Sequence, residues 1–197
     1  MSRLPVEGAG AGAGAGDSVR HAAFAPIVDA NTRVLILGSL PGVVSLGAGR
    51  YYAHPQNAFW RLVGAAIGTD LDRLGYDARL AMLRAHGIGL WDTVATARRS
   101  GSLDAAIRDI DARDLAGLIA TLPALRLVAF NGQKAAAIGT RTLPPGFPHV
   151  TLPSSSPAHT LNFAAKAAAW AVVGAGLAIG SPLAPYLPPP YIAAVGS

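Results

Sequence analysis

The 197-residue chain contains no cysteine and only one glutamate, Glu7. Without thiols it can form neither disulfides nor thiolate intermediates, and it can hold neither Fe–S clusters nor cysteine-ligated zinc. Because Glu7 lies in the N-terminal tail, any catalytic carboxylate must be an aspartate. We therefore expect a protein that works without a metal, an Fe–S cluster or another cofactor.

Targeting and membrane segments are also missing. The N-terminus lacks a charged segment followed by a leucine-rich stretch, which would mark a secretory signal. The apolar stretch Ala167–Ile179 is too short to cross a bilayer and begins just after Lys166. We expect a cytoplasmic protein with no membrane partner.

A single domain is expected between two low-complexity ends. Gly8–Gly16 alternates glycine with alanine and offers no side chain to bury, so we expect disorder there. Ser181–Ser197 carries prolines that can sustain neither a helix nor a central strand. The expected organisation is a tail over residues 1–21, a domain over 22–180 and a second tail over 181–197.

The formal net charge is +5, and the excess falls on the domain. A basic domain is compatible with a polyanionic partner such as nucleic acid. Arginine outnumbers lysine fourteen to two, so genome base composition is a second explanation of the excess.

Hydrophobic patterning alternates strands with helices. Continuous aliphatic runs predict buried strands at Arg33–Gly38, Ile88–Trp91, Leu125–Phe130 and Pro148–Leu152. Helical spacing predicts helices at Asn57–Ile67, Asp77–Ala85, Leu103–Ile110, Ala112–Thr121, 133–138 and Asn162–Leu177. This order predicts an α/β fold, a three-layer α/β/α sandwich around a mainly parallel four-stranded sheet. The loops after the four strands should meet at one edge of that sheet.

The loop Gly38–Gly42 follows the first predicted strand. It is neither a dinucleotide-binding fingerprint, nor a Walker loop, nor a nucleophile elbow. A tight turn without a ligand explains this loop as well as a binding site does.

Aromatic and amide side chains follow in Tyr51–Trp60. Phe59 and Trp60 open an amphipathic helix and are expected in the core. Tyr52 precedes that helix and could stack on a nucleic-acid base. Asn57 could cap the helix, form a turn, hold a water molecule or read a base edge.

Three hydroxyls, Ser154, Ser155 and Ser156, follow the last predicted strand. Hydroxyls and backbone N–H groups before a helix can hold phosphate oxygens, although capping without a ligand is an equal alternative. His159 ends this loop and is either an exposed loop residue or a wedge that enters a base stack.

Five motifs in this order resemble the uracil-DNA glycosylase superfamily from about Phe24 to Val173. The resemblance is strongest to the hypoxanthine-DNA (deoxyinosine) glycosylase branch, with mismatch-specific thymine/uracil glycosylases as cousins. The motifs are Leu35–Gly42, Tyr51–Trp60, Gly89–Asp92, Phe130–Lys134 and Leu152–His159.

The resemblance implies a role for each site residue. Leu40 stands where the mismatch-specific cousins carry a water-positioning asparagine, and the hypoxanthine branch shares this lack. In the hypoxanthine branch, catalysis is assigned to an asparagine further along the chain, and that asparagine maps to Asn57. Tyr52 matches the aromatic that stacks on the extruded base, while Asp92 stands where cousins contact the base. The remaining base-binding assignments are Gly38, Ser39, Leu40 and Asn131, and the duplex-entering loop is Ser154, Ser155, Ser156, Pro157, Ala158 and His159.

The implied function is a monofunctional DNA glycosylase that removes hypoxanthine, with uracil or xanthine as further substrates. Lys134 and Lys166 fall in predicted helices, which argues against a Schiff-base lyase step. We expect a monomer that binds DNA. The alternatives are a uracil- or mismatch-specific glycosylase and a non-catalytic nucleic-acid-binding module. A serine hydrolase using Ser39 or Ser155 with His159 is a third, which no elbow spacing supports.

Overall fold

A computed structural model describes residues 20–99 and 107–178. Seven strands are β1 (Arg20–Ala22), β2 (Val34–Gly38), β3 (Ile88–Asp92), β4 (Val94–Arg99), β5 (Ile107–Ala112), β6 (Leu127–Asn131) and β7 (His149–Leu152). The α-helices in these ranges are α1 (Val43–Ala48), α2 (Phe59–Ile67), α3 (Tyr76–Ala85), α4 (Leu115–Ala120), α5 (Gln133–Gly139) and α6 (Phe163–Leu177), and η1 (Leu71–Arg73) is a 3₁₀ helix. The two predicted tails lie almost wholly outside the described residues, and β1 begins at Arg20, just before the predicted domain start.

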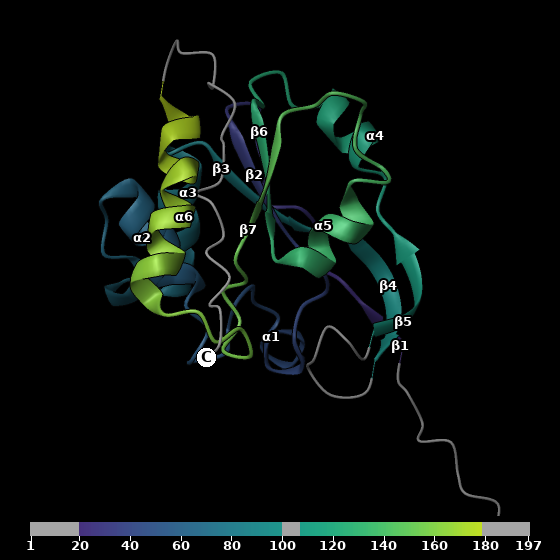
Figure 1. Cartoon of the computed structure of the whole chain (residues 1–197), viewed down its shortest axis with the longest axis horizontal. Coiled ribbons are helices and arrows are strands. Elements are labelled where there is room, and N and C mark those ends of the chain that lie inside the picture. Colours follow the sequence, from purple (N-terminus) through teal and green to yellow (C-terminus); the bar gives the residue numbers. More distant parts are fainter. Residues whose placement is uncertain (1–19, 100–106, 179–197) are drawn as a thin grey trace, which may run out of the picture.

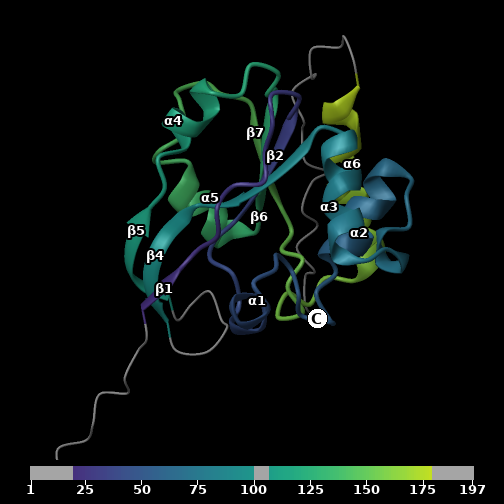
Figure 2. The ribbon, with the colours of Figure 1, turned by 180° about the vertical axis from the view of Figure 1, so that it is seen from behind.

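The central sheet has the strand order β3-β2-β6-β7, and all its paired strands are parallel. Helices α2, α3 and α6 cover one face, and α4 and α5 cover the other (Figures 1 and 2). This confirms the predicted three-layer α/β/α arrangement around a four-stranded parallel sheet. The carboxyl ends of the four strands point to the edge where α1 lies (Figure 1).

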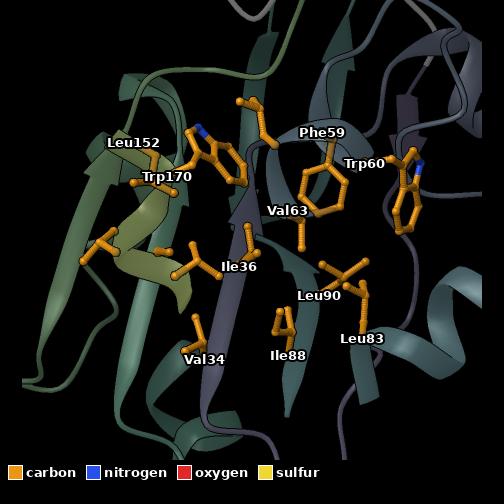
Figure 3. Packing of buried hydrophobic residues seen from close by; sticks show 14 of the residues in the cluster. Val34, Ile36, Phe59, Trp60, Val63, Leu83, Ile88, Leu90, Leu152 and Trp170 are labelled. Atoms are coloured by element: carbon orange, nitrogen blue, oxygen red, sulfur yellow. The ribbon is translucent and has the colours of Figure 1, made fainter. Parts of the chain in front are cut away.

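Alternation along β2 divides the core into two clusters. Val34 and Ile36 join a cluster with α2 and α6, whereas Leu35 and Leu37 pack on the other face. Figure 3 shows Phe59 of α2 and Trp170 of α6 above Ile36. Both aromatic side chains are fully buried, so α2 is anchored immediately after the Tyr51–Trp60 motif.

Helices α2 and α6 pack closely because glycine stands at their contact. A methyl group added at Gly174 would collide with the backbone carbonyl of Ala66. The close packing brings the start of α6 beside the start of α2. Both loops that precede these helices therefore reach the same edge of the sheet.

The predicted helix Leu103–Ile110 is wrong in its described part. Residues 103–106 lie outside the described ranges, and the rest belongs to strand β5, which pairs antiparallel with β4. Asp109 has a left-handed φ of 48°, which an α-helix cannot contain. Together with β1, these strands form a second, three-stranded sheet that the hydrophobic pattern did not predict.

The helix predicted at Ala112–Thr121 begins later, at Leu115. Asp114 stops it from starting earlier, because its carboxylate accepts a 2.9 Å hydrogen bond from the Gly117 N–H and caps the helix. Ala112 instead ends β5. Helix α1, which follows the Gly38–Gly42 loop, was not predicted.

Candidate active site

A cavity of about 300 Å³ opens at the carboxyl ends of the parallel strands. It is lined by every site residue chosen from the sequence: Gly38, Ser39, Leu40, Tyr52, Asn57, Asp92, Asn131, Ser154, Ser155, Ser156, Pro157, Ala158 and His159. The structure thus brings all of them together. Six further residues line the cavity that the sequence reasoning did not choose as site residues: Pro41, Gly42, Val44, Ser45, Tyr51 and His54.

Gly38 and Asp92 lie side by side at the ends of β2 and β3, where they are register partners. A Cβ atom at Gly38 would lie 2.8 Å from Asp92 Oδ1 and 3.4 Å from the Tyr52 hydroxyl. Only glycine therefore lets the Asp92 side chain come this close to the neighbouring strand. The Asp92 side chain is almost fully buried, with 3% of its surface exposed.

Tyr51 provides a protonated phenol beside that carboxylate. Burial, and secondarily the neighbouring Asp92, raise the pKa of the Tyr51 hydroxyl above its ordinary value. The phenol therefore keeps its proton at physiological pH. Tyr51 lies in the same motif as Tyr52, so the paired tyrosines were the available sequence signal.

Tyr52 is held firmly at the cavity wall. Its ring stacks on Phe59 at a centroid distance of 3.6 Å and an interplanar angle of 7°. Its φ of 52° is left-handed, which is uncommon for a residue with a side chain. Asn131 Nδ2 donates to its hydroxyl at 3.3 Å, and Trp60 Nε1 donates to its carbonyl at 3.3 Å. The aromatic surface is fixed before any ligand binds.

Asn57 both lines the cavity and shapes the start of α2. Its Oδ1 accepts a 3.0 Å hydrogen bond from the Phe59 N–H. The N-cap of α2 is Ala58, without a side-chain capping bond, so Asn57 forms a turn just before the helix and is not its N-cap. This turn does not exclude a second role. A carboxamide oxygen has a second lone pair, and the two Nδ2 protons have no hydrogen-bond partner within residues 20–99 and 107–178.

Leu40 forms an apolar part of the cavity wall. Only 6% of its surface is exposed, and it belongs to a small hydrophobic cluster with Val94 and Ile138. The Leu40 side chain therefore offers neither a donor nor an acceptor to a water molecule. Asn57, with its amide, and Asp92, with its carboxylate, also line the cavity and can bind a water molecule where Leu40 cannot.

Asn131 joins the end of β6 to the loop Ser154–His159, which we call the serine loop. Its Nδ2 donates to Ser155 Oγ at 2.8 Å, and its Oδ1 accepts from the Ser155 N–H at 2.8 Å. The Ser155 carbonyl accepts from the Ala58 N–H at 3.0 Å, which connects this loop to the Tyr51–Trp60 motif. Ser155 is buried with 1% exposure, so its hydroxyl serves this connection.

The outer part of the loop is shaped by its own hydroxyls. Ser154 Oγ accepts from the Ser156 N–H at 3.2 Å, and Ser156 Oγ accepts from the Ala158 N–H at 3.3 Å. Both hydroxyls act as acceptors here, so their protons remain available for an anion such as phosphate. Pro157, Ala158 and His159 are exposed at the tip.

The ring of His54 has a defined tautomer. Its Nδ1 accepts a 3.2 Å hydrogen bond from the Gln56 N–H, so the neutral ring carries its proton on Nε2. His54 lies in the Tyr51–Trp60 motif and faces the cavity. Its position between Tyr52 and Asn57 was a signal that the sequence reasoning passed over.

Within residues 20–99 and 107–178, no group of three or more histidines, cysteines, aspartates or glutamates is placed to hold a metal ion. No helix in these ranges is long and apolar enough to span a membrane.

Known proteins share this sequence and this architecture. A family model for the uracil DNA glycosylase superfamily matches residues 25–174. A curated protein named hypoxanthine DNA glycosylase from Methanosarcina barkeri is 39% identical over 153 residues, covering 78% of this chain and 97% of the relative. A protein of the same name from Methanosarcina acetivorans is 43% identical over 136 residues, covering 69% of this chain and 86% of the relative.

A solved structure agrees with these matches. A solution NMR structure of a Methanosarcina acetivorans protein has a TM-score of 0.73 and 39% sequence identity, covering 81% of this chain and 99% of that one. Fold, motif order and overall sequence all point the same way. This chain belongs to the uracil-DNA glycosylase superfamily.

Proposed function

We propose that this protein is a monofunctional DNA glycosylase that extrudes hypoxanthine from DNA and hydrolyses its N-glycosidic bond. The observation that carries the proposal is the single cavity in which Tyr52, Asn57 and Asp92 meet the serine loop. The names of the two Methanosarcina relatives support hypoxanthine as the substrate. Uracil and xanthine are secondary substrates under the same proposal.

The cavity is suited to a base rather than to a duplex. Its volume of about 300 Å³ falls at the lower end of ligand pockets, and it lies behind the exposed loop tip. A base reaches such a site only after leaving the helix, which costs a few kcal/mol and least for a mispaired base. Hypoxanthine and uracil arise by deamination and therefore pair poorly with the original partner.

Base recognition in this proposal uses a rigid aromatic surface and one carboxylate. The Phe59-backed ring of Tyr52 stacks on the extruded base, a contact worth about 1–3 kcal/mol. Asp92 accepts the N1–H of hypoxanthine, and backbone N–H groups of the Gly38–Gly42 loop donate to O6. Asn131 acts mainly on the protein side, because its carboxamide already bonds Ser155 and Tyr52.

Cleavage proceeds through an oxocarbenium-like sugar, and the electron pair of the C–N bond leaves with the base. Asn57 positions the attacking water, using the second lone pair of Oδ1 or an Nδ2 proton. A neutral amide is no effective base, so the water loses its proton only as its oxygen bonds to the sugar carbon. That proton passes to solvent, and the departing base, which holds the electron pair of the C–N bond, takes up one proton in exchange. Most of the acceleration comes from positioning and from stabilisation of the departing base.

The positions of the two lysines do not support a lyase step through a Schiff base. Lys166 Nζ donates to the carbonyls of Ser156 and His159, and Lys134, on α5, is not among the residues that line the cavity. A Schiff base needs a neutral amine at the sugar carbon. The product is therefore an intact strand that carries an abasic site.

The test is a release assay on oligonucleotides that carry one hypoxanthine, uracil or xanthine, each single-stranded and in duplex. We expect hypoxanthine to be released fastest, and the strand to break only after alkali treatment. Breakage without alkali would refute monofunctionality, and release of uracil alone would favour the uracil-specific alternative. DNA binding without base release would favour a non-catalytic module. Asn57→Ala is the matched inactive control.

Two further parts of the proposal concern assembly and location. We propose that the enzyme acts as a monomer on DNA in the cytoplasm. Analytical ultracentrifugation with and without a duplex tests the monomer, since a dimer in either sample would contradict it. Cell fractionation tests the location.

A further inference from the structure

Lys166 is a buried cation directly beneath the serine loop. It lies in the first turns of α6, and only 4% of its surface is exposed. Its Nζ donates to the carbonyl of His159 at 2.8 Å and to that of Ser156 at 3.3 Å. In the described part of the chain, Lys166 makes no ion pair with a carboxylate.

Fold stability does not explain a lysine at this position. Burial lowers the pKa of the Lys166 ammonium, which shows that the charged form is disfavoured there. The positive end of the α6 dipole lies at the same helix terminus and disfavours a cation further. The neighbouring turns of α6 are rich in alanine, the one residue with a clearly higher helix propensity than lysine.

The two carbonyls that bind Lys166 bracket the exposed loop tip. The His159 N–H donates to the Ser156 carbonyl at 3.1 Å and closes a turn around Pro157 and Ala158. Lys166 bonds both ends of this turn from inside the protein. Asn131 fixes the preceding residue, Ser155, to the sheet. The tip is thus held from two sides, although it is exposed itself.

We propose that Lys166 is a positioning residue that holds the Pro157–His159 tip in the shape that enters duplex DNA at the extruded nucleotide. This inference rests on the proposed glycosylase function. Holding the loop in advance removes the ordering cost from the duplex-bound step. Single-stranded DNA offers no base stack to enter, so it gains much less from an ordered tip.

The chemistry of the chain permits a sharp test, because it has no cysteine of its own. A Lys166→Cys variant is alkylated in denaturant with 2-bromoethylamine or with 1-bromopropane and is then refolded. The first adduct restores an ammonium at the length of lysine, and the second puts a methyl group in its place. Wild-type protein and Lys134→Met, at the other lysine of the chain, pass through the same steps as controls.

The aminoethyl adduct should approach the wild-type rate of hypoxanthine release from duplex DNA. The propyl adduct should be slower by about tenfold, the order expected for losing hydrogen bonds from a charged donor. Release from single-stranded DNA should differ between the adducts by less than about threefold. Equal duplex rates for the two adducts, or equal losses on both substrates, would overturn the positioning role.

Two readouts keep this inference separate from the proposed function. Amide hydrogen exchange at Ala158 and His159 should be faster in the propyl adduct than in the aminoethyl adduct, with no DNA present. Affinity for a duplex with a stable abasic analogue should also be weaker for the propyl adduct. If wild-type protein releases no base, the proposed function fails, and the binding and exchange differences still decide the inference. Identical exchange and identical affinity would refute it.

Discussion

Asn57 combines a structural contact with a proposed catalytic one, and substitutions can separate the two. Asn57→Ala removes the 3.0 Å hydrogen bond that the Phe59 N–H donates to Oδ1. Loss of such a side-chain hydrogen bond costs about 1 kcal/mol of the free energy of unfolding. For a chain of this size, that cost lowers the melting temperature by about 2–4 °C.

The same substitution should slow base release far more than it affects stability. Removing a group that positions water or stabilises charge in the transition state costs about 10²–10³-fold in rate. A protein destabilised by about 1 kcal/mol is still almost entirely folded at 25 °C, so this destabilisation cannot explain a hundredfold loss of the release rate. DNA affinity should stay within about threefold of wild type, because the serine loop does not depend on this side chain.

Asn57→Ser is the matched comparison. The serine hydroxyl can accept from the Phe59 N–H in the same kind of turn, but it lacks the amide group and the reach of asparagine. We expect it to recover most of the lost stability and little of the lost rate. The assays are urea denaturation and single-turnover release of hypoxanthine under enzyme excess. If Asn57→Ser restored both quantities together, Asn57 would be a structural residue only.

Three further predictions concern the walls of the site. Tyr52→Ala should slow release more than Tyr52→Phe, because phenylalanine keeps the stacking face on Phe59; equal single-turnover rates would argue against stacking. Gly38→Ala should lower activity at least tenfold and cost about 1–3 kcal/mol by urea denaturation, since the methyl group would lie 2.8 Å from Asp92 Oδ1; wild-type values would show that Asp92 can move. His159→Ala should reduce release from duplex more than from single-stranded DNA, and a uniform effect on both would exclude a wedge at this position.

Resemblance to the family motifs named the residues of the site, and the position of those motifs at strand ends predicted that they would meet. Parallel strands bring such ends to one edge, so the order of the motifs was enough to place Tyr52, Asp92 and the serine loop together. Buried aliphatic runs predicted the four strands of the central sheet to within two residues at each end, and the alternation of strands with helices predicted the layers. The functional roles of these residues remain predictions that the experiments above test.

The sequence pattern could not predict contacts between residues far apart in the chain. The alternation at Ile107–Ala112 suited a strand as well as a helix, and pairing with β4 decides between them. Lys166 resembles an ordinary surface residue of a helix, since nothing local reveals that carbonyls of the serine loop lie over its ammonium. Two of the three side-chain hydrogen bonds of Asn131 depend on Ser155, 24 residues away, and the third on Tyr52, 79 residues away, so its scaffold role was equally hidden.

The hydrogen bond from Ala58 to Ser155 has a consequence for how the protein matures. These residues are far apart in the chain, and the paired strands β2, β6 and β7 lie between them in the sheet that brings them together. Closing so long a loop is slow relative to forming local helices. A newly made chain therefore acquires its helices and much of its sheet before it acquires the cavity. Partly folded molecules lack the cavity that would bind a base, so catalytic activity would indicate that the domain is completely folded.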